Sequence, residues 1–280
     1  MSTIAIITDS TAYIPEKYLR EYPIYVIPLL IIWGNETFHD GVDIKPSEFY
    51  TRLEKSSVIP TTSQPTPNDY KQLYDRLLEK GHEILVVTIS SKLSGTMDSA
   101  ILAKAMLPGA PIEIVDSLST AMAMGYQVLA GARAIKNDSK LTEIKSVVEK
   151  AREHSGVVFT PVTLKYLHLG GRIGGATRYL GNALNIKPIL DLENGVIEAL
   201  ERMRTRPKAL NRVVEIVAQR AGNRPIRLGA LHANAIEDAQ SLIDEASKKM
   251  KVIESVVTDV SPAIGVHAGP GTAGLAYMIE

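Results

Sequence analysis

Hydroxyl side chains gather where one apolar run of the sequence ends. Residues 84–89 are rich in β-branched residues and predict a strand buried in a parallel sheet. Residues 97–107 are rich in Ala, Leu and Met and predict a helix. Ser94, Gly95 and Thr96 lie between the two. Free backbone N–H groups and the positive end of the helix dipole favour a small anion at such a junction. Alternatively, Ser94 or Thr96 caps the helix.

Three other segments carry hydroxyl groups next to predicted strands. They are residues 8–11 with Asp9 and Ser10, residues 59–67 with Thr61, Thr62 and Ser63, and residues 116–120 with Asp116. The prolines of segment 59–67 restrict its backbone, which makes it a candidate wall of a site. Ligands of parallel α/β sheets bind beyond the carboxyl ends of the strands. We therefore expect the four hydroxyl-rich segments to meet in one site. For any single segment, the alternative is that its Ser and Thr residues are ordinary loop and cap residues.

Arg172 and His267 are two further candidates. Arg172 follows two glycines, where a sharp turn can aim its guanidinium inward, or it forms a surface salt bridge. His267 lies in the glycine-rich segment 264–274, which we expect to be a turn near the chain end. A lone histidine is more often structural, but flanking glycines allow close approach to a ligand. The glycines of this segment spell G-x-G-x-x-G, yet no complete βαβ unit follows, so a dinucleotide site is not expected.

Two kinds of enzyme can be weighed from these residues. Ser94, His267 and either Asp9 or Asp116 would be the parts of a catalytic triad, because triads are defined by geometry rather than by chain order. A lipid or ester hydrolase with Ser94 as nucleophile is therefore one alternative. The sequence has no Walker A motif and no G-x-S-x-G motif. It contains no cysteine, which removes thiolate catalysis.

The composition is that of a neutral globular protein. The chain has 280 residues, of which 45% are hydrophobic, and 31 basic residues balance 31 acidic ones. This balance gives no overall field that would hold nucleic acid, so any anionic contact must be a local patch. The first residues lack the charged start and long apolar core of a signal peptide. The longest apolar run, residues 26–33, is too short to span a bilayer. We expect a cytoplasmic protein.

Alternating strands and helices predict the fold class. In the first half we expect strands at 4–7, 24–33, 84–89 and 112–115 and helices at 14–20, 46–55, 69–80, 97–107, 121–135 and 141–154, with a turn at 38–43. This pattern is typical of a doubly wound parallel sheet, a Rossmann-like α/β domain. In the second half we expect a hairpin at 186–200, strands at 157–160, 226–231 and 252–260, and helices at 208–221 and 236–249. We predict an α/β parallel-sheet domain at 1–155 and an α+β domain at 156–280.

Taken together, the motifs resemble the DegV family, whose characterised members include the fatty-acid-binding subunits of bacterial fatty acid kinase. The matching pieces are Thr8-Asp-Ser-Thr-Ala12, Asp40-Gly-Val-Asp43, Thr62-Ser-Gln-Pro65, Ile89-Ser-Ser-Lys-Leu-Ser-Gly-Thr96, Val115-Asp-Ser117, Leu164-Lys-Tyr-Leu167, Gly170-Gly-Arg-Ile173, Ile186-Lys-Pro-Ile189 and His267 with Gly269-Pro-Gly271. Each piece is weakly specific, but the ordered set covers nearly the whole chain. Gly174 and Gly175 depart from the serine usual in the family.

The resemblance implies a protein that holds one long-chain fatty acid in a tunnel between two domains, with no other cofactor and no metal. It implies that Thr62, Ser94, Gly95 and His267 bind the carboxylate. The supporting polar network would consist of Asp9, Ser10, Thr61, Ser63, Thr96 and Arg172. A separate ATP-dependent fatty acid kinase subunit would then phosphorylate the carboxylate to an acyl phosphate for phospholipid synthesis. The chain itself would not be an enzyme.

One basic cluster stands out in the neutral chain. Arg202, Arg204 and Arg206 lie within five residues, with Arg212 nearby. The cluster is either a solvated face or a contact for the kinase subunit or an anionic membrane surface.

Overall fold

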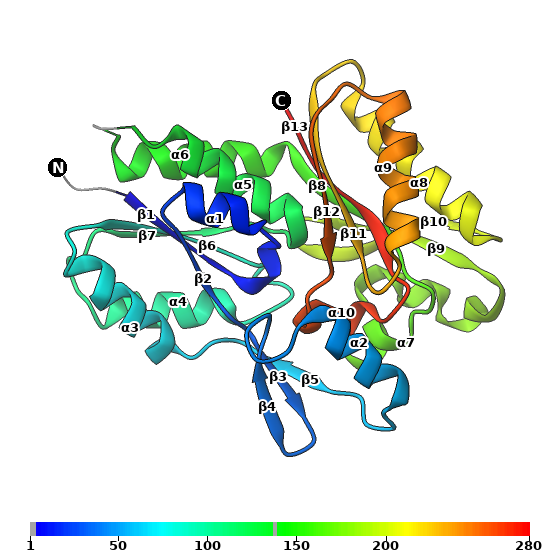
Figure 1. Ribbon diagram of the computed structural model, residues 1–280, viewed down its shortest axis with the longest axis horizontal. Helices are drawn as coiled ribbons and strands as arrows, with labels where there is room; N and C mark the ends of the chain where they lie inside the picture. The colour runs from blue at the N-terminus through cyan, green and yellow to red at the C-terminus, as the bar shows by residue number, and fades with distance from the viewer. Residues whose placement is uncertain (1–3, 137–138) are drawn as a thin grey trace.

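The first half of the chain folds around a four-stranded parallel sheet (Figure 1). The computed structural model describes residues 4–136 and 139–280. The strand order is β2-β1-β6-β7, from β1 (Ile4–Asp9), β2 (Ile24–Ile27), β6 (Glu83–Thr88) and β7 (Ile112–Asp116). The helices are η1 (Ser10–Ala12), α1 (Glu16–Glu21), α3 (Pro67–Leu78), α4 (Thr96–Ala105), α5 (Ala121–Ala134) and α6 (Leu141–Glu153). The parallel sheet predicted from the alternation of strands and helices is confirmed.

A small antiparallel sheet corrects three of the predictions. It has the order β4-β3-β5, from β3 (Leu30–Trp33), β4 (Glu36–His39) and β5 (Thr61–Ser63), and α2 (Pro46–Lys55) follows β4. The single strand predicted at 24–33 is wrong, because Pro28 separates β2 from β3 and the two strands join different sheets. Part of the turn predicted at 38–43 belongs to β4, and the predicted loop 59–67 contains β5. Pro28 interrupts the run of strand because proline has no backbone N–H to donate to a ladder.

The second half forms a six-stranded mixed sheet in the order β10-β9-β8-β13-β11-β12. Its strands are β8 (Ser155–Thr160), β9 (Lys187–Glu193), β10 (Val196–Met203), β11 (Ile226–His232), β12 (Val252–Asp259) and β13 (Ala273–Ile279). Its helices are α7 (Lys165–Leu169), η2 (Gly174–Asn185), α8 (Arg206–Ala221), α9 (Ile236–Lys249) and α10 (Pro262–Ala268). The predicted hairpin around Asn194 and Gly195 is confirmed as β9 and β10. No strand was predicted at β13, which follows the glycine-rich segment directly.

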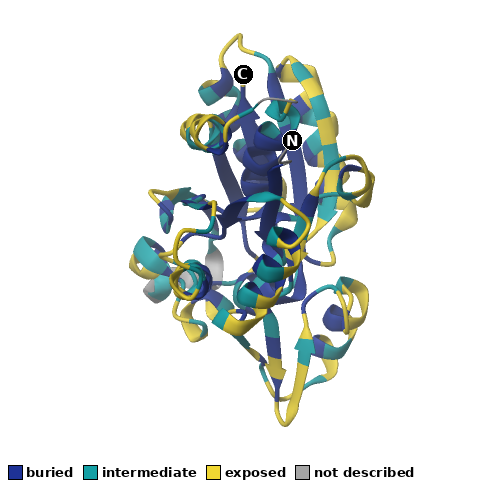
Figure 2. Cartoon of the chain, turned by 90° about the vertical axis from the view of Figure 1, so that its left-hand side faces the viewer, coloured by how far each residue is buried: buried dark blue, intermediate teal, exposed yellow. Residues whose placement is uncertain are grey.

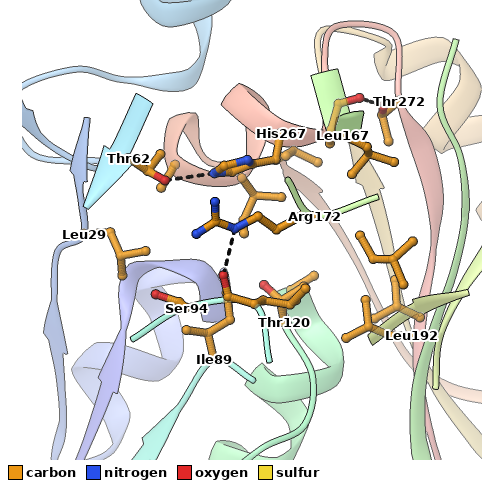
Figure 3. A pocket seen from close by; sticks show the side chains of 18 of the residues that line it. Leu29, Thr62, Ile89, Ser94, Thr120, Leu167, Arg172, Leu192, His267 and Thr272 are labelled. Atoms are coloured by element: carbon orange, nitrogen blue, oxygen red, sulfur yellow. Dashed lines mark hydrogen bonds between the residues drawn. The ribbon is translucent and has the colours of Figure 1, made fainter. Parts of the chain in front are cut away.

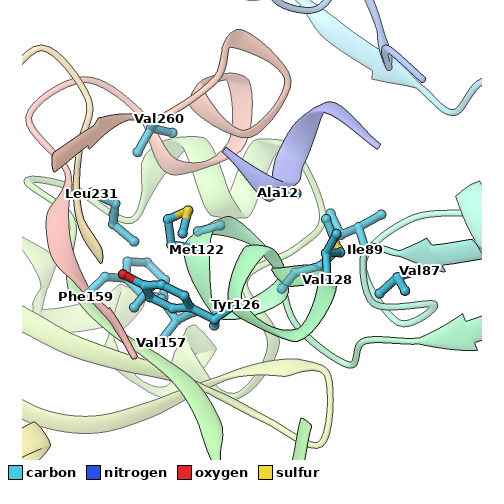
Figure 4. Close-up of a cluster of buried hydrophobic side chains, with 14 of the residues drawn as sticks. Ala12, Val87, Ile89, Met122, Tyr126, Val128, Val157, Phe159, Leu231 and Val260 are labelled. Atoms are coloured by element: carbon cyan, nitrogen blue, oxygen red, sulfur yellow. The ribbon is translucent and has the colours of Figure 1, made fainter. Parts of the chain in front are cut away.

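Helix α5 lies between the two large sheets and joins them in one core. Eleven of its fourteen residues are buried. Met122 and Tyr126 of α5 face the second half, toward Val157, Phe159 and Leu231, whereas Val128 lies on the side of Val87 and Ile89 (Figure 4). Gly229 on β11 lets the helix approach, because a side chain there would collide with Met122. Figure 2 shows the resulting buried centre of the molecule.

Candidate functional site

A cavity of about 80 Å³ lies between the two halves, polar at one end and apolar over most of its wall. Figure 3 shows Thr62, His267, Arg172 and Ser94 near one another, with Leu167 and Leu192 further along. The polar lining residues are Tyr13, Thr62, Ser63, Gln64, Ser94, Thr120, Arg172, His267 and Thr272. The apolar lining residues include Leu29, Ile89, Leu93, Val157, Phe159, Leu167, Leu192, Ile197, Leu231 and Val260. Such a lining fits an amphipathic ligand with one polar end.

Ser94 lies at the cavity immediately before α4. The N-cap of α4 is Gly95, which has no side chain that could accept a hydrogen bond from the first turn of the helix. Ser94 and Thr96 are instead hydrogen-bonded to each other, with their hydroxyl oxygens 2.9 Å apart. Neither residue caps the helix, so the alternative that Ser94 or Thr96 serves as its cap is wrong. The positive end of a ten-residue helix without a side-chain cap therefore lies directly after Ser94.

Thr62 and His267 form the opposite side of the polar end. Thr62 comes from β5, and its Oγ1 lies 2.8 Å from Nε2 of His267. His267 belongs to α10, so the prediction that it sits in a glycine-rich turn is wrong; Gly265 lies within this helix, and Gly269 is its C-cap. Burial, helped by the positive charge of Arg172, lowers the pKa of His267 from 6.5 to about 4. The imidazole is therefore neutral at physiological pH.

Arg172 lies between these two sides. Its Nε donates to the carbonyl oxygen of Leu93 at 3.0 Å and its Nη1 to the carbonyl oxygen of Gly170 at 2.6 Å. Figure 3 shows the guanidinium between His267 and Ser94. Arg172 thus ties the loop before Ser94 to the turn after α7 and brings a positive charge to the polar end.

Three of the polar residues also line a second pocket of about 480 Å³. Thr62, Arg172 and His267 belong to both linings. The other walls of the second pocket come from residues 57–61, from Tyr166, Leu169 and Gly170 and from Val266. The three shared residues therefore lie between the mainly apolar cavity, called the inner cavity below, and the larger second pocket, called the outer pocket.

A sequence model of the DegV family, described as uncharacterised protein, DegV family, matches residues 3–280. The chain belongs to the DegV family. This confirms the resemblance found in the ordered motifs. A DegV domain-containing protein of Streptomyces coelicolor is 36% identical over 274 residues, which make up 97% of this chain and 97% of that protein.

Two solved structures of DegV family proteins resemble the chain along its whole length. One is from Thermus thermophilus and is described in terms of its fatty acid binding; it matches with a TM-score of 0.93 at 33% identity over 99% of this chain and 100% of that chain. The other is DegV of Bacillus subtilis, described as a fatty acid binding protein, with a TM-score of 0.88 at 32% identity over 100% of both chains.

Five of the residues expected at the DegV site do not line the inner cavity. They are Asp9, Ser10, Thr61, Gly95 and Thr96. Thr61 lines the outer pocket, and Ser10 donates a hydrogen bond to Asp40 at 2.6 Å. Gly95 stands directly behind Gln64, where an added Cβ would lie 3.1 Å from Nε2.

Asp9 supports the site from behind. It is fully buried, and its carboxylate accepts hydrogen bonds from Thr11 and, at 2.7 Å, from the backbone N–H of Ile89. Burial raises the pKa of Asp9 from 3.8 to about 6, although these hydrogen bonds oppose the rise. Asp9 thereby fixes the start of the loop that ends at Ser94.

The hydrogen bonds of the site differ from those of a catalytic triad. The hydroxyl of Ser94 is paired with Thr96 and the imidazole of His267 with Thr62. The carboxylate of Asp9 is held by Thr11 and Ile89, and that of Asp116 accepts from backbone N–H groups. A serine nucleophile needs a base within hydrogen-bond reach. The geometry therefore favours binding by Ser94 over the hydrolase alternative.

Several lining residues were absent from the set predicted by sequence. Gln64 lies inside the Thr62-Ser-Gln-Pro65 motif, so its neighbours could have pointed to it. Thr120 was not named singly, but it ends the hydroxyl-rich segment 116–120 that was expected at the site. Tyr13 has a positive φ of 55°. No sequence signal marks the aliphatic wall, because its residues come from strands and helices of both halves.

The two glycines that depart from the family pattern have a local explanation. Gly174 has a φ of 50°, and a Cβ there would overlap the carbonyl of Ile197. A Cβ on Gly175 would overlap the carboxylate of Glu198. These glycines let η2 pack closely against β10.

The arginines of the basic cluster differ in whether they contact the rest of the chain. Arg202 and Arg204 are exposed. Arg206 is held within the chain, because its guanidinium donates to Asp238 at 2.7 Å and to the carbonyl oxygen of Thr160 at 2.9 Å. Only the first two side chains are therefore placed to meet a partner.

Two negative findings apply to residues 4–136 and 139–280. None of the helices there combines the length and the apolar character needed to cross a membrane. Nor do three or more His, Asp or Glu side chains in that part of the chain come together in a way that would hold a metal ion.

Proposed function

We propose that this chain binds a long-chain fatty acid, with its carboxylate between Ser94 and the Thr62–His267 pair and its acyl chain along the apolar wall. The observation that carries the proposal is that Ser94, Thr62 and His267 line a mainly apolar cavity together, with the uncapped start of α4 directly after Ser94. The descriptions of the relatives from Thermus thermophilus and Bacillus subtilis as fatty acid binding support it.

The cavity is small for a long-chain fatty acid. Its volume of about 80 Å³ is well below the roughly 300–1,000 Å³ of pockets that hold drug-sized ligands. A long acyl chain therefore requires the walls between the halves to separate, giving the tunnel that the family resemblance implies. Burial of each methylene stabilises the complex by about 0.8 kcal/mol, so the acyl chain supplies most of the affinity. The polar residues mainly set the orientation of the ligand.

We further propose that the bound carboxylate is presented through the outer pocket to a separate ATP-dependent fatty acid kinase subunit, which forms an acyl phosphate in the cytoplasm. Thr62 and Ser94 are neutral donors and His267 is neutral at physiological pH, so much of the carboxylate's charge remains available for reaction. Arg172 lines both pockets and can steady the negative charge that a phosphoryl group brings.

Binding is tested with the protein as purified from bacterial cells. Native mass spectrometry should show one fatty acid per chain, and a titration of delipidated protein with oleate should give binding that Thr62→Val and Ser94→Ala each weaken about tenfold. Thr61→Val is the matched control, because Thr61 faces the outer pocket alone, and its affinity should be unchanged. Protein that carries no fatty acid and binds no oleate would refute the proposal.

The kinase role needs its own experiment. A bacterial fatty acid kinase subunit, ATP and the loaded protein should yield acyl phosphate, trapped as the hydroxamate, whereas loaded protein with ATP alone should yield none. Arg172→Gln should reduce the product at least tenfold while most of the bound fatty acid is retained. Normal fatty acid binding without any acyl phosphate would leave the binding proposal standing and reject the kinase role.

Arg202 and Arg204 are proposed to contact the kinase subunit or an anionic membrane. Reversing both charges with Glu should weaken acyl phosphate formation or binding to phosphatidylglycerol vesicles. Arg224→Glu is a control on another exposed part of the chain. If the double reversal changes neither measurement, the two arginines are a solvated face.

A further inference from the structure

Asp40 is a buried carboxylate that lines neither the inner cavity nor the outer pocket. It directly follows β4 of the small antiparallel sheet and is only 2% exposed. Its Oδ2 accepts a hydrogen bond from Ser10 at 2.6 Å, and its Oδ1 accepts one from the backbone N–H of Ala263 at 3.2 Å. Ala263 lies in the first turn of α10. A side chain of the first half therefore holds the start of a helix of the second half.

We propose that Asp40 is a positioning residue for fatty acid binding, which holds the start of α10 so that His267 meets Thr62. This inference rests on the proposed binding of a carboxylate by those two residues. The first N–H groups of a helix have no partner within it. The N-cap of α10 is Ser261, whose side chain forms no capping hydrogen bond, so Asp40 supplies an acceptor from outside the helix.

The spacing along α10 connects Asp40 to the imidazole. Ala263 and His267 are four residues apart, so they lie on the same side of the helix, about one turn from each other. Both residues line the inner cavity. A displacement at the start of this short helix is therefore passed directly to the His267 ring.

The small antiparallel sheet holds α10 at both ends. Asp40 follows β4 and Thr62 lies on β5, and both strands pair with β3. The hydrogen bond to Asp40 fixes the first turn of α10, and the hydrogen bond between Thr62 and His267 fixes its last turn. Figure 1 shows α10 next to this sheet and to α2. One hydrogen-bonded sheet thus sets the position of the imidazole relative to its partner.

Ser10 orients the Asp40 carboxylate. Its Oγ donates to Asp40 and accepts a hydrogen bond from the backbone N–H of Leu29 at 3.1 Å. The backbone N–H of Asp40 in turn donates to the carbonyl oxygen of Leu29 at 2.8 Å. Leu29 lines the inner cavity. Ser10 therefore acts on the site through Asp40 and Leu29, although it does not line the cavity itself.

A double-mutant cycle with Thr62→Val tests the proposal. Asp40→Ala removes both hydrogen bonds and should weaken oleate binding about tenfold. Asp40→Asn keeps an oxygen for the N–H of Ala263 and should recover most of that affinity. Because Asp40 acts through His267 and Thr62, Asp40→Ala should weaken binding less than about twofold in the Thr62→Val background. A similar loss in both backgrounds, or wild-type affinity in Asp40→Ala, would overturn the proposal.

Two further variants separate positioning from general destabilisation. Tyr74→Phe removes another buried hydrogen bond, from Tyr74 to the carbonyl oxygen of Ala100 at 3.2 Å, and neither residue lines either pocket. Its affinity for oleate should be unchanged, and a loss equal to that of Asp40→Ala would overturn the proposal. If Asp40→Ala does not fold, Ser10→Ala repeats the cycle, with an expected loss of about threefold that disappears in the Thr62→Val background.

The NMR signal of the His267 ring gives a readout that needs no ligand. In delipidated protein with isotope-labelled histidine, His267→Gln identifies this signal among those of the six histidines. Asp40→Ala should move the signal toward its position in Thr62→Val, whereas Asp40→Asn and Tyr74→Phe should leave it in place. An unmoved signal in Asp40→Ala would overturn the positioning role. These shifts in a protein that binds no oleate would instead refute the proposed function and support the link from Asp40 to His267.

Discussion

His267 is a residue of the polar end whose chemistry is changed by its surroundings. Its ring is buried, lies near the charge of Arg172 and is hydrogen-bonded to Thr62, and its pKa of about 4 keeps it neutral. Gly170 lies directly behind it, since a Cβ there would overlap Nδ1. The position of the imidazole is thus set by a glycine nearly a hundred residues earlier in the chain.

The lowered pKa makes stability depend on pH. A histidine with a pKa of 6.5 in the unfolded chain and about 4 in the folded chain binds fewer protons when folded. Its contribution is fully present above pH 6.5 and is lost as the pH falls toward 4. Between pH 7 and pH 5, we expect the free energy of unfolding of the wild type to fall by about 2 kcal/mol more than that of His267→Gln. Urea unfolding at the two pH values measures this difference. A difference between the two proteins that does not vary with pH would contradict the buried neutral ring.

Gly170→Ala tests the support of the ring. The added methyl group must displace the imidazole of His267, which breaks the hydrogen bond between His267 and Thr62. We expect the affinity for oleate to fall at least tenfold while the melting temperature changes by only a few degrees. His168 is exposed and lies in α7, two residues before Gly170. His168→Ala should bind oleate normally. Unchanged binding by Gly170→Ala would show that the position of His267 does not matter for the ligand.

At the scale of elements, the site is assembled by contacts between segments that are distant in sequence. The tip of the β9–β10 hairpin rests on the loop that leads to Ser94, where Ser90 donates a hydrogen bond to the carbonyl oxygen of Gly195 at 2.8 Å. Gly195 has a φ of 82°, and a Cβ there would overlap the Ser90 hydroxyl. Leu192 and Ile197 on the same hairpin line the cavity. This contact therefore sets the distance between two walls.

Ser90→Ala should measure the strength of this contact. Both groups are buried, so the carbonyl of Gly195 would lose its partner without gaining water. We expect the free energy of unfolding to fall by about 2 kcal/mol, measured with urea. Ser91→Ala removes an exposed hydroxyl next to it and should cost less than about 0.5 kcal/mol. Equal effects of the two substitutions would mean that the contact does not stabilise the fold.

At the scale of the whole molecule, the two halves share a core and a charged network. The buried cluster around α5 contains residues of both sheets (Figure 4). In a partly buried network, Glu254 of β12 accepts from Tyr18 at 2.5 Å and from Arg133 at 2.9 Å, both from the first half, and pairs with Arg227. The domains predicted at 1–155 and 156–280 meet where β8 opens the second sheet, but they are not separated by solvent.

A shared core predicts one cooperative unfolding transition. Calorimetry of the full chain should give a single peak with calorimetric and van't Hoff enthalpies that agree. Residues 1–155 expressed alone would expose the face of α5 that packs against Val157 and Phe159, and we expect them to aggregate or to lack a cooperative transition. Two resolved transitions in the full chain would instead show that the halves are independent domains.

The sequence by itself determined the local elements and the residues of the polar end. Apolar runs ending in hydroxyls located β6 and the start of α4, and Asn194-Gly195 located the hairpin, because these signals depend on neighbours in the chain. Ser94, Thr62, Arg172 and His267 were all named from sequence and do meet at the cavity. Their individual roles toward a carboxylate stay predictions.

The tertiary structure alone decided which neighbours those residues have. Thr62 reaches the site from a small separate sheet, and His267 reaches it from a helix, whereas sequence placed them in a loop and a turn. Asp9, in the hydroxyl-rich segment that sequence placed at the site, instead supports it from behind. Burial, which lowers the pKa of His267 and raises that of Asp9, depends on packing between distant segments. No local pattern of residues encodes that packing, so the cavity wall and the electrostatics emerge only in the folded chain.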